Sequence, residues 1–257
     1  MTYMDGLLSG VIQGVTEFLP VSSSGHLVLL HRILGIKIPN VQFDVFLHAS
    51  TLLATVIYFR KDIVRILLRD RKFLFFICIG SVPIILTALF WGSLIEVSFQ
   101  NVFFVSCMLL ITGVWLIIGH SAEVFLQKGM FSRKGPSIKT SFIVGVTQAL
   151  SLLPGISRSG VTISTGMILG LKRETAFKFS FLLSIPAVFG ACVYKLSSLD
   201  VQHAAQNLGA YFVGGFTAFV FGLVTIRVLY LVLSKRKMHY FGIYCLVIGG
   251  ISLILSF

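Results

Sequence analysis

Charged side chains are scarce in this sequence. Only 12% of its 257 residues are Asp, Glu, Lys or Arg, whereas about a quarter is typical of a soluble domain. Hydrophobic residues, in contrast, make up 56% of the chain. This balance excludes an ordinary soluble globular domain. It predicts one all-α polytopic membrane domain that covers residues 1–257.

Acidic residues are fewer still, since nine Asp and Glu stand against 21 Lys and Arg, and the formal net charge is +12. A soluble protein with this excess would be expected to bind nucleic acid. The sequence contains no nucleic-acid-binding motif and does not interleave basic with aromatic residues, so we expect no nucleic-acid partner. The four cysteines all lie in apolar stretches without metal-ligand spacing, which is typical of small hydrophobic helix residues.

Long apolar runs are frequent. Six are long enough to cross the hydrocarbon core of a bilayer, which takes about 17–25 residues. They cover approximately residues 43–59, 73–91, 100–118, 175–195, 208–233 and 239–257. Four others are too short or marginal, and they cover residues 4–19, 26–35, 141–153 and 161–171. These four form two pairs, each joined by a polar turn, and therefore predict two re-entrant helix hairpins beside six transmembrane helices.

Basic residues indicate the orientation, because loops rich in Lys and Arg stay on the cytoplasmic side. Loop 60–72 holds six of them, whereas loop 92–99 holds none. With six crossings and two re-entrant hairpins, every basic loop falls on the same side. The two halves then enter the membrane from opposite faces. This predicts an inverted-topology repeat of about residues 1–118 and about residues 140–257.

A polar segment interrupts the first apolar region. Residues 13–26 read Gln-Gly-Val-Thr-Glu-Phe-Leu-Pro-Val-Ser-Ser-Ser-Gly-His. Gln13 and Glu17 are four residues apart, so a helix would place them on one face. Pro20 disfavours helix at the residue before it and predicts that the first helix stops there. We expect a polar turn over residues 22–25, followed by a helix whose free N–H groups form an anion site.

A second segment repeats this design. Residues 154–162 read Pro-Gly-Ile-Ser-Arg-Ser-Gly-Val-Thr, and Arg158 adds a guanidinium that suits bidentate contact with phosphate. Ser24-Gly25 and Ser159-Gly160 are each followed, after seven residues, by Ile-Leu-Gly. This match indicates two copies of one unit about 135 residues apart.

The two segments resemble the two signatures of the bacterial undecaprenyl-diphosphate phosphatases, the bacitracin-resistance family, and the resemblance covers essentially the whole chain. It implies hydrolysis of undecaprenyl diphosphate to undecaprenyl phosphate and inorganic phosphate. That reaction recycles the lipid carrier for peptidoglycan synthesis and confers bacitracin resistance. The resemblance also implies a multi-pass protein of the bacterial inner (cytoplasmic) membrane. Some members carry glutamate where this chain has Gln13, and an amide cannot carry a proton.

Four residues are candidates for catalysis: Glu17, Ser23, His26 and Arg158. Arg158 and the N–H groups of both turns would clamp the diphosphate. Ser23 would attack phosphorus or orient a water, and Glu17 would orient His26, act as the base or hold a cation. We assign attack to Ser23 and proton transfer to His26, with Glu17 steering the imidazole. The simpler alternative is a structural Glu17–Arg158 ion pair, which does not explain the serines or the histidine.

Eight further residues are candidates for substrate binding. Some have a simpler interpretation, since Ser22 and Ser24 could cap the helix that follows, and Thr162 could bond back to its own helix. The histidines outside the two segments, His48 among them, are expected to be helix-interior or surface polar groups. The eight candidates are Gln13, Ser22, Ser24, Gly25, Ser157, Ser159, Gly160 and Thr162.

The resemblance also implies a divalent cation, Mg²⁺ or Ca²⁺, with Glu17 as its candidate ligand. One carboxylate is too little to hold such an ion tightly in the free protein. The expected partners are a polyprenyl diphosphate lipid substrate and membrane lipids, and a homodimer is compatible with the sequence. The alternative function is a polyprenyl-phosphate lipid flippase or transporter, because inverted repeats with a polar midplane site also serve transport.

Overall fold

A computed structural model describes residues 1–36, 41–127, 135–196 and 205–255. These residues form eleven helices and no strand. Along the chain the helices are α1 (Tyr3–Thr16), α2 (Ser23–Leu34), α3 (Val41–Tyr58), α4 (Arg60–Leu68), α5 (Arg71–Ser98), α6 (Val102–Gln127), α7 (Ile138–Leu150), α8 (Arg158–Ile168), α9 (Arg173–Leu196), α11 (Leu208–Ser234) and α12 (His239–Leu255). The all-α prediction is therefore confirmed for the described part of the chain.

Four helices are long and apolar enough to cross a membrane, namely α5, α6, α9 and α11. They coincide with four of the six predicted spans and make the chain a membrane protein. The other two predicted spans correspond to α3, with 18 residues, and α12, with 17. At about 1.5 Å per residue these two helices rise by roughly 25–27 Å, slightly less than a hydrocarbon core of about 30 Å. Their crossing stays a prediction.

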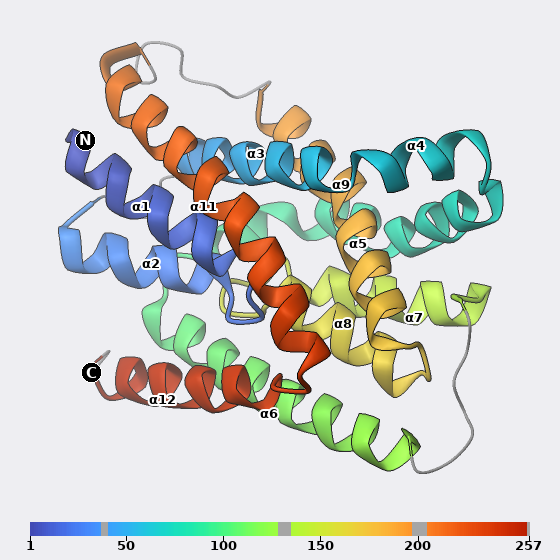
Figure 1. Cartoon of the computed structure of the whole chain (residues 1–257). Coiled ribbons are helices and arrows are strands. Elements are labelled where there is room, and N and C mark those ends of the chain that lie inside the picture. Colours follow the sequence, from blue (N-terminus) through green and yellow to red (C-terminus); the bar gives the residue numbers. More distant parts are fainter. Residues whose placement is uncertain (37–40, 128–134, 197–204, 256–257) are drawn as a thin grey trace.

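The two short pairs fold as hairpins, α1 with α2 and α7 with α8. Their helices have 14, 12, 13 and 11 residues, which is too short for a full crossing. In Figure 1, α1 and α2 extend from the left edge toward the centre, whereas α7 extends from the right edge. The turns of both hairpins lie next to each other at the centre, where the Ser159 hydroxyl donates to the Leu19 carbonyl at 3.3 Å.

Several boundaries differ from those expected. The predicted loop 60–72 contains the helix α4, and α5 continues through the predicted loop 92–99 as far as Ser98. Asp62 lies in the first turn of α4, where a carboxylate stabilises the helix dipole, and Ile66 faces the protein interior. The residues Lys128, Arg133 and Lys134 of the next predicted basic loop lie outside the described part of the chain.

Glycine lets the hairpins approach the long helices closely. α1 packs along α11, and α7 packs along α5. A methyl group at Gly10 would collide with the backbone of Gly214, and one at Gly145 would collide with the backbone of Gly80. Close backbone approach at small residues is the usual means of holding helices together in lipid, where the apolar environment gives no hydrophobic drive. Each hairpin is therefore fixed by its first helix.

Aromatic side chains form the core beside the first turn. Phe18 stacks on Phe181 with ring centroids 5.6 Å apart, and Phe181 also contacts Phe59 and Phe177. All four side chains are fully buried. Because Phe18 immediately follows Glu17, this cluster anchors the backbone from which the candidate carboxylate projects.

Candidate active site

The first turn begins where α1 stops. α1 ends at Thr16, Glu17 is its C-cap, and Pro20 lies in the turn that follows. Ser22 is the N-cap of α2 and accepts a hydrogen bond from the Gly25 N–H at 3.3 Å. Its φ of 70° is unusual for a residue with a side chain, and such strained positions gather at functional sites. Ser23 and Ser24, expected in a turn, therefore lie in the first turn of α2.

The second turn has the same cap. Ser157 is the N-cap of α8, accepts from the Gly160 N–H at 3.2 Å, and leaves Arg158 as the first residue of the helix. Gly155 has a φ of 100°, and a Cβ there would clash with the backbone of α6. The Thr112 hydroxyl of α6 donates to the Gly155 carbonyl at 2.8 Å and accepts from the Ser157 N–H at 3.1 Å. The turn is thus held against a long helix.

Glu17 is the centre of the polar cluster where the turns meet. The Arg158 Nη2 lies 2.5 Å from its Oε1, across a sequence separation of 141 residues. The Ser23 hydroxyl donates to Oε2 at 2.6 Å, and the Gln13 amide donates to the same oxygen at 3.1 Å. The cluster is nearly closed, since Glu17 is 9% exposed. The structure therefore brings together three of the four candidate catalytic residues and Gln13.

Only one of the two terminal nitrogens of Arg158 has a hydrogen-bond partner among the described residues. Its Nη1 is buried and has no hydrogen-bond partner among the described residues, while its Nη2 holds Glu17. A buried guanidinium nitrogen without an acceptor is costly unless a ligand or water completes it. A phosphate oxygen is a suitable acceptor, because a guanidinium presents two parallel N–H bonds.

His26 does not contact Glu17, contrary to the expectation that Glu17 would steer the imidazole. Its Nδ1 lies 2.8 Å from the Ser22 carbonyl, and its Nε2 lies 2.8 Å from the Tyr244 hydroxyl. Since a carbonyl only accepts, Nδ1 carries the proton, and Nε2 is the unprotonated, basic nitrogen that accepts from the Tyr244 hydroxyl. The two rings also stack, with centroids 5.6 Å apart and an angle of 6°. Tyr244 lies 218 residues from His26, and no local sequence signal indicated it.

His48 is a second addition to the site and corrects the interpretation of this histidine as an unrelated polar group. Its Nδ1 lies 3.2 Å from the Glu17 Oε2 and 2.9 Å from the Gln13 Nε2. One signal could have revealed it. Asp44 and His48 lie four residues apart in an otherwise apolar helix, and ionisable residues within a membrane helix usually have a functional reason.

The remaining candidates line the turns themselves. The hydroxyls of Ser22 and Ser24 lie 3.3 Å apart, as do those of Ser157 and Ser159. Gly25 and Gly160 supply the N–H groups that the caps bind, and a Cβ on Gly25 would come within 3.2 Å of Gly155 in the other turn. Thr162 points elsewhere, because its hydroxyl donates to the Arg158 carbonyl at 2.7 Å and contacts Ser180 at 2.6 Å.

A resident metal ion does not fit this donor set. The described residues contain no group of three or more His, Cys, Asp and Glu side chains that could hold a metal. Among the described residues, Glu17 is the only carboxylate that contacts Arg158, Ser23 or Gln13; the Arg158 guanidinium occupies its Oε1, and Ser23 and Gln13 donate to its Oε2. A cation on this carboxylate would also lie beside the positive charge of Arg158. The residues of this cluster therefore do not form a cation site without help from a ligand.

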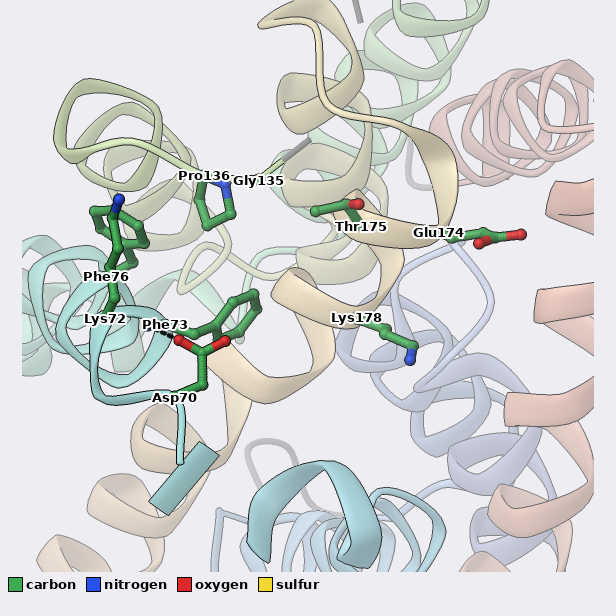
Figure 2. Close-up of a pocket in the computed structure, with 9 residues that line it drawn as sticks. All are labelled: Asp70, Lys72, Phe73, Phe76, Gly135, Pro136, Glu174, Thr175 and Lys178. Carbon is green, nitrogen blue, oxygen red and sulfur yellow. Dashed lines mark hydrogen bonds between the residues drawn. The ribbon is translucent and has the colours of Figure 1, made fainter. Parts of the chain in front are cut away.

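A separate groove opens at the N-terminal ends of α5 and α9, and Figure 2 shows it. Both lysines and carboxylates line it, and none of the predicted site residues does. The lining residues are Asp70, Lys72, Phe73, Phe76, Gly135, Pro136, Glu174, Thr175 and Lys178. The polar cluster around Glu17 is therefore distinct from this groove.

Long apolar helices around a buried cluster of Ser, Glu, Arg and His define an integral membrane protein with an internal polar site. The family model described as Bacitracin resistance protein BacA matches residues 6–251. The chain belongs to this family.

Curated relatives extend over nearly the whole chain. A protein of Desulfosudis oleivorans named undecaprenyl-diphosphatase is 40% identical over 276 aligned residues, with 98% of each chain covered. One of Christiangramia forsetii with the same name is 38% identical, with 100% of this chain and 99% of the relative covered. Another, of Methanosphaera stadtmanae, is 34% identical with 98% of each covered.

Proposed function

We propose that this protein is an undecaprenyl-diphosphate phosphatase, which hydrolyses undecaprenyl diphosphate to undecaprenyl phosphate and inorganic phosphate. The observation that carries the proposal is the Ser23 hydroxyl held at 2.6 Å from Glu17, whose other oxygen binds Arg158. A nucleophile, a base and a phosphate-binding cation thus meet within one buried cluster. Family membership and the names of the relatives support the same reaction.

In the first half of the reaction, Ser23 attacks the terminal phosphorus. The Ser23 O–H bond breaks and its proton passes to the Glu17 Oε2, while the oxygen–phosphorus bond forms. The bond from that phosphorus to the bridging oxygen breaks, and undecaprenyl phosphate leaves. The spare Nη1 of Arg158 and the N–H groups at the starts of α2 and α8 stabilise the charge on the phosphoryl oxygens.

In the second half, water hydrolyses the phosphoserine. The water gives one proton to the His26 Nε2 while its oxygen bonds to phosphorus, the bond between phosphorus and Ser23 breaks, and the Ser23 oxygen takes back its proton from the Glu17 Oε2. His26 suits the activation of this water, because the Ser22 carbonyl fixes the proton on Nδ1 and leaves Nε2 basic. Tyr244 holds Nε2 in the resting site and must yield it to the water.

The cation and the cellular setting belong to the same proposal. Mg²⁺ or Ca²⁺ would enter with the diphosphate, whose oxygens supply the ligands that the protein lacks, and it would add charge neutralisation when bound. The polyprenyl chain would lie along the apolar helices.

We place the protein in the bacterial inner membrane, with six crossings, two re-entrant hairpins and an inverted repeat; the opposed hairpins of Figure 1 support this arrangement. A homodimer stays a prediction.

Phosphate release by the purified protein in detergent tests the function. We expect undecaprenyl diphosphate to yield one inorganic phosphate per turnover, and we expect a chelator to stop the reaction and added Mg²⁺ or Ca²⁺ to restore it. Detergent removes the second compartment that transport requires. Movement of polyprenyl phosphate across vesicles without any phosphate release would instead support the flippase alternative.

A further inference from the structure

His48 reaches the catalytic cluster from α3, an element that contains neither sequence signature. Its Nδ1 lies 3.2 Å from the Glu17 Oε2 and 2.9 Å from the Gln13 Nε2. The side chain is 27% exposed, so it lies at the edge of the cluster, whereas Glu17 has a side-chain exposure of 7%. α3 therefore adds to the carboxylate an imidazole that is more accessible than the carboxylate itself.

The contacts of Glu17 differ in what they can do with a proton. Arg158 remains charged at any physiological pH, and the amide of Gln13 does not titrate. Ser23 gives its proton to Glu17 in the first half of the reaction. Among these four contacts of Glu17, His48 is the one that can both accept and release a proton near neutral pH.

The two oxygens of the Glu17 carboxylate have different partners, and this arrangement suits the transfer of a proton. Arg158 holds Oε1, whereas Ser23 and His48 both contact Oε2. A proton that leaves Ser23 therefore arrives on the oxygen that His48 touches. The Gln13 amide donates to this oxygen and also contacts the Nδ1 of His48, so it fixes the two groups relative to each other.

We propose that His48 is a positioning residue for Glu17 that takes up the proton delivered by Ser23 and returns it through Glu17 when the phosphoserine is hydrolysed. The inference rests on the proposed function. In this step the proton moves from the Glu17 Oε2 to the His48 Nδ1 while the other ring nitrogen keeps its own proton. When the bond between phosphorus and Ser23 breaks, the proton returns by the same path, from the His48 Nδ1 to the Glu17 Oε2 and on to the Ser23 oxygen. The charged groups that act on the imidazole are Glu17, Arg158 and Asp44.

His48→Asn tests the proposal, because asparagine keeps a polar group near the position of Nδ1 but cannot accept a proton. His48→Gln is the second variant in case the first unfolds. His239→Asn is the matched control on α12, where the ring of this partly buried histidine lies tilted against that of His120, with centroids 4.5 Å apart. We expect kcat to fall about 100-fold in both His48 variants, with KM changed less than about threefold, because proton transfer contributes about 100-fold or more. The control should keep its activity, and all variants should melt near the wild-type temperature.

The pH profile and a rescue distinguish proton transfer from packing. The loss in His48→Asn should shrink as pH rises, because solvent then removes the proton. Gln13→Glu in the same chain puts a second carboxylate beside Glu17, and two adjacent carboxylates share a proton. This double variant should recover at least about tenfold of the lost kcat.

Wild-type kcat in His48→Asn, a loss that does not vary with pH, or a Gln13→Glu variant that rescues nothing would each overturn the proposal. Failure of the wild-type protein to release phosphate would instead refute the proposed function itself, so the two failures are distinguishable.

Discussion

At the residue scale, the site depends on how Glu17 shares its two oxygens. Arg158 neutralises one, and Ser23 bonds to the other. Removing one partner of a buried ion pair leaves an uncompensated charge, which costs about 3–5 kcal/mol. The same Glu17–Arg158 contact can therefore serve structure and catalysis. A variant distinguishes the two roles only if it preserves the charge of the residue that it replaces.

The variant Arg158→Lys distinguishes the structural role of Arg158 from its catalytic role. Lysine keeps the positive charge beside Glu17 but lacks the second parallel N–H that the guanidinium holds in reserve. We expect the variant to fold and insert while kcat falls about 100-fold or more, as for the loss of one transition-state donor. Phosphate release and thermal melting in detergent measure the two effects, and Arg227→Lys on the exposed surface of α11 is the control. Near-normal turnover would reduce Arg158 to a generic charge.

Ser23→Ala and Glu17→Gln should be equally damaging. Because the Ser23 hydroxyl donates directly to Glu17, the two act as one unit, and members of one catalytic unit are not additive. We expect each single variant to lose about a thousandfold or more in kcat and the double variant to be scarcely worse. Trapping of radiolabelled phosphoserine in wild-type protein would identify the nucleophile. If Ser23→Ala retains most activity while His26→Ala is inactive, the attacking group is His26 or a water.

The sequence singled out those residues of the polar cluster that lie inside the two signatures and missed the neighbours that lie outside them. Gln13, Glu17 and Ser23 were predicted because polar residues in an apolar helix stand out locally. His48 and Tyr244 were missed because their importance comes from contacts across 31 or more residues, which only the packing of α3 and α12 creates. The partner of His26 was also wrong, since hydrogen-bond direction within a turn depends on backbone angles such as that of Ser22.

At the element scale, glycines decide which helices can touch. Gly10 in α1 lies against Gly214 in α11, and Gly145 in α7 lies against Gly80 in α5. Gly10 and Gly145 are 135 residues apart, the same offset that relates Ser24 to Ser159 in the two motif turns. The same close contact thus occurs once in each hairpin, which supports the predicted repeat.

Gly10→Ala should push α1 away from α11, because its methyl group would collide with the backbone of Gly214. Overpacking of this kind costs about 1–3 kcal/mol. We expect a lower melting temperature in detergent and a loss of turnover, since α1 carries Gln13 and Glu17 is its C-cap. Gly92→Ala is the control, because a Cβ at this position in α5 meets no atom within 4 Å. Equal stability of the two variants would contradict this account of the packing.

The helix boundaries show where sequence patterns were too coarse. The apolar runs located the elements, but basic residues at 60–72 were interpreted as a loop although α4 occupies Arg60–Leu68. Charged residues do not prevent a helix, and α4 turns one side toward the protein, since Ile66 is buried while Leu67 and Leu68 are exposed. The helix α5 likewise continues past the expected end of its span, through Glu96 to Ser98.

At the scale of the whole molecule, each packing contact between the two halves of the chain has a counterpart in which the halves change roles. α1 packs on α11 as α7 packs on α5, and α3 packs on α11 as α9 packs on α5. α6 and α12 pack on each other through Gly113 and Gly242, where a Cβ on either residue would come within 3 Å of the other's carbonyl oxygen. A twofold relation between the halves would produce these paired contacts. It would also bring both motif turns to the centre, where Figure 1 shows them.

The opposed hairpins predict which ends of the chain face which side of the membrane. If α1 and α2 form a re-entrant hairpin, both of its open ends lie outside the cell, whereas the basic segments around Lys61 and Lys237 lie inside. The measurement uses a variant without its four native cysteines, into which single cysteines are placed at Met4, Arg32, Lys61 or Lys237; all four positions are exposed.

A membrane-impermeant maleimide should label cysteines at Met4 and Arg32 on intact cells and should label those at Lys61 and Lys237 only after permeabilisation. A fixed charge on the reagent prevents it from crossing the bilayer, so the first pair reports the outer face directly. Labelling of Met4 and Arg32 from opposite sides would mean that the segment crosses the membrane an odd number of times. The two motif turns could not then converge from opposite faces, and the inverted arrangement that brings Arg158 to Glu17 would need a different topology.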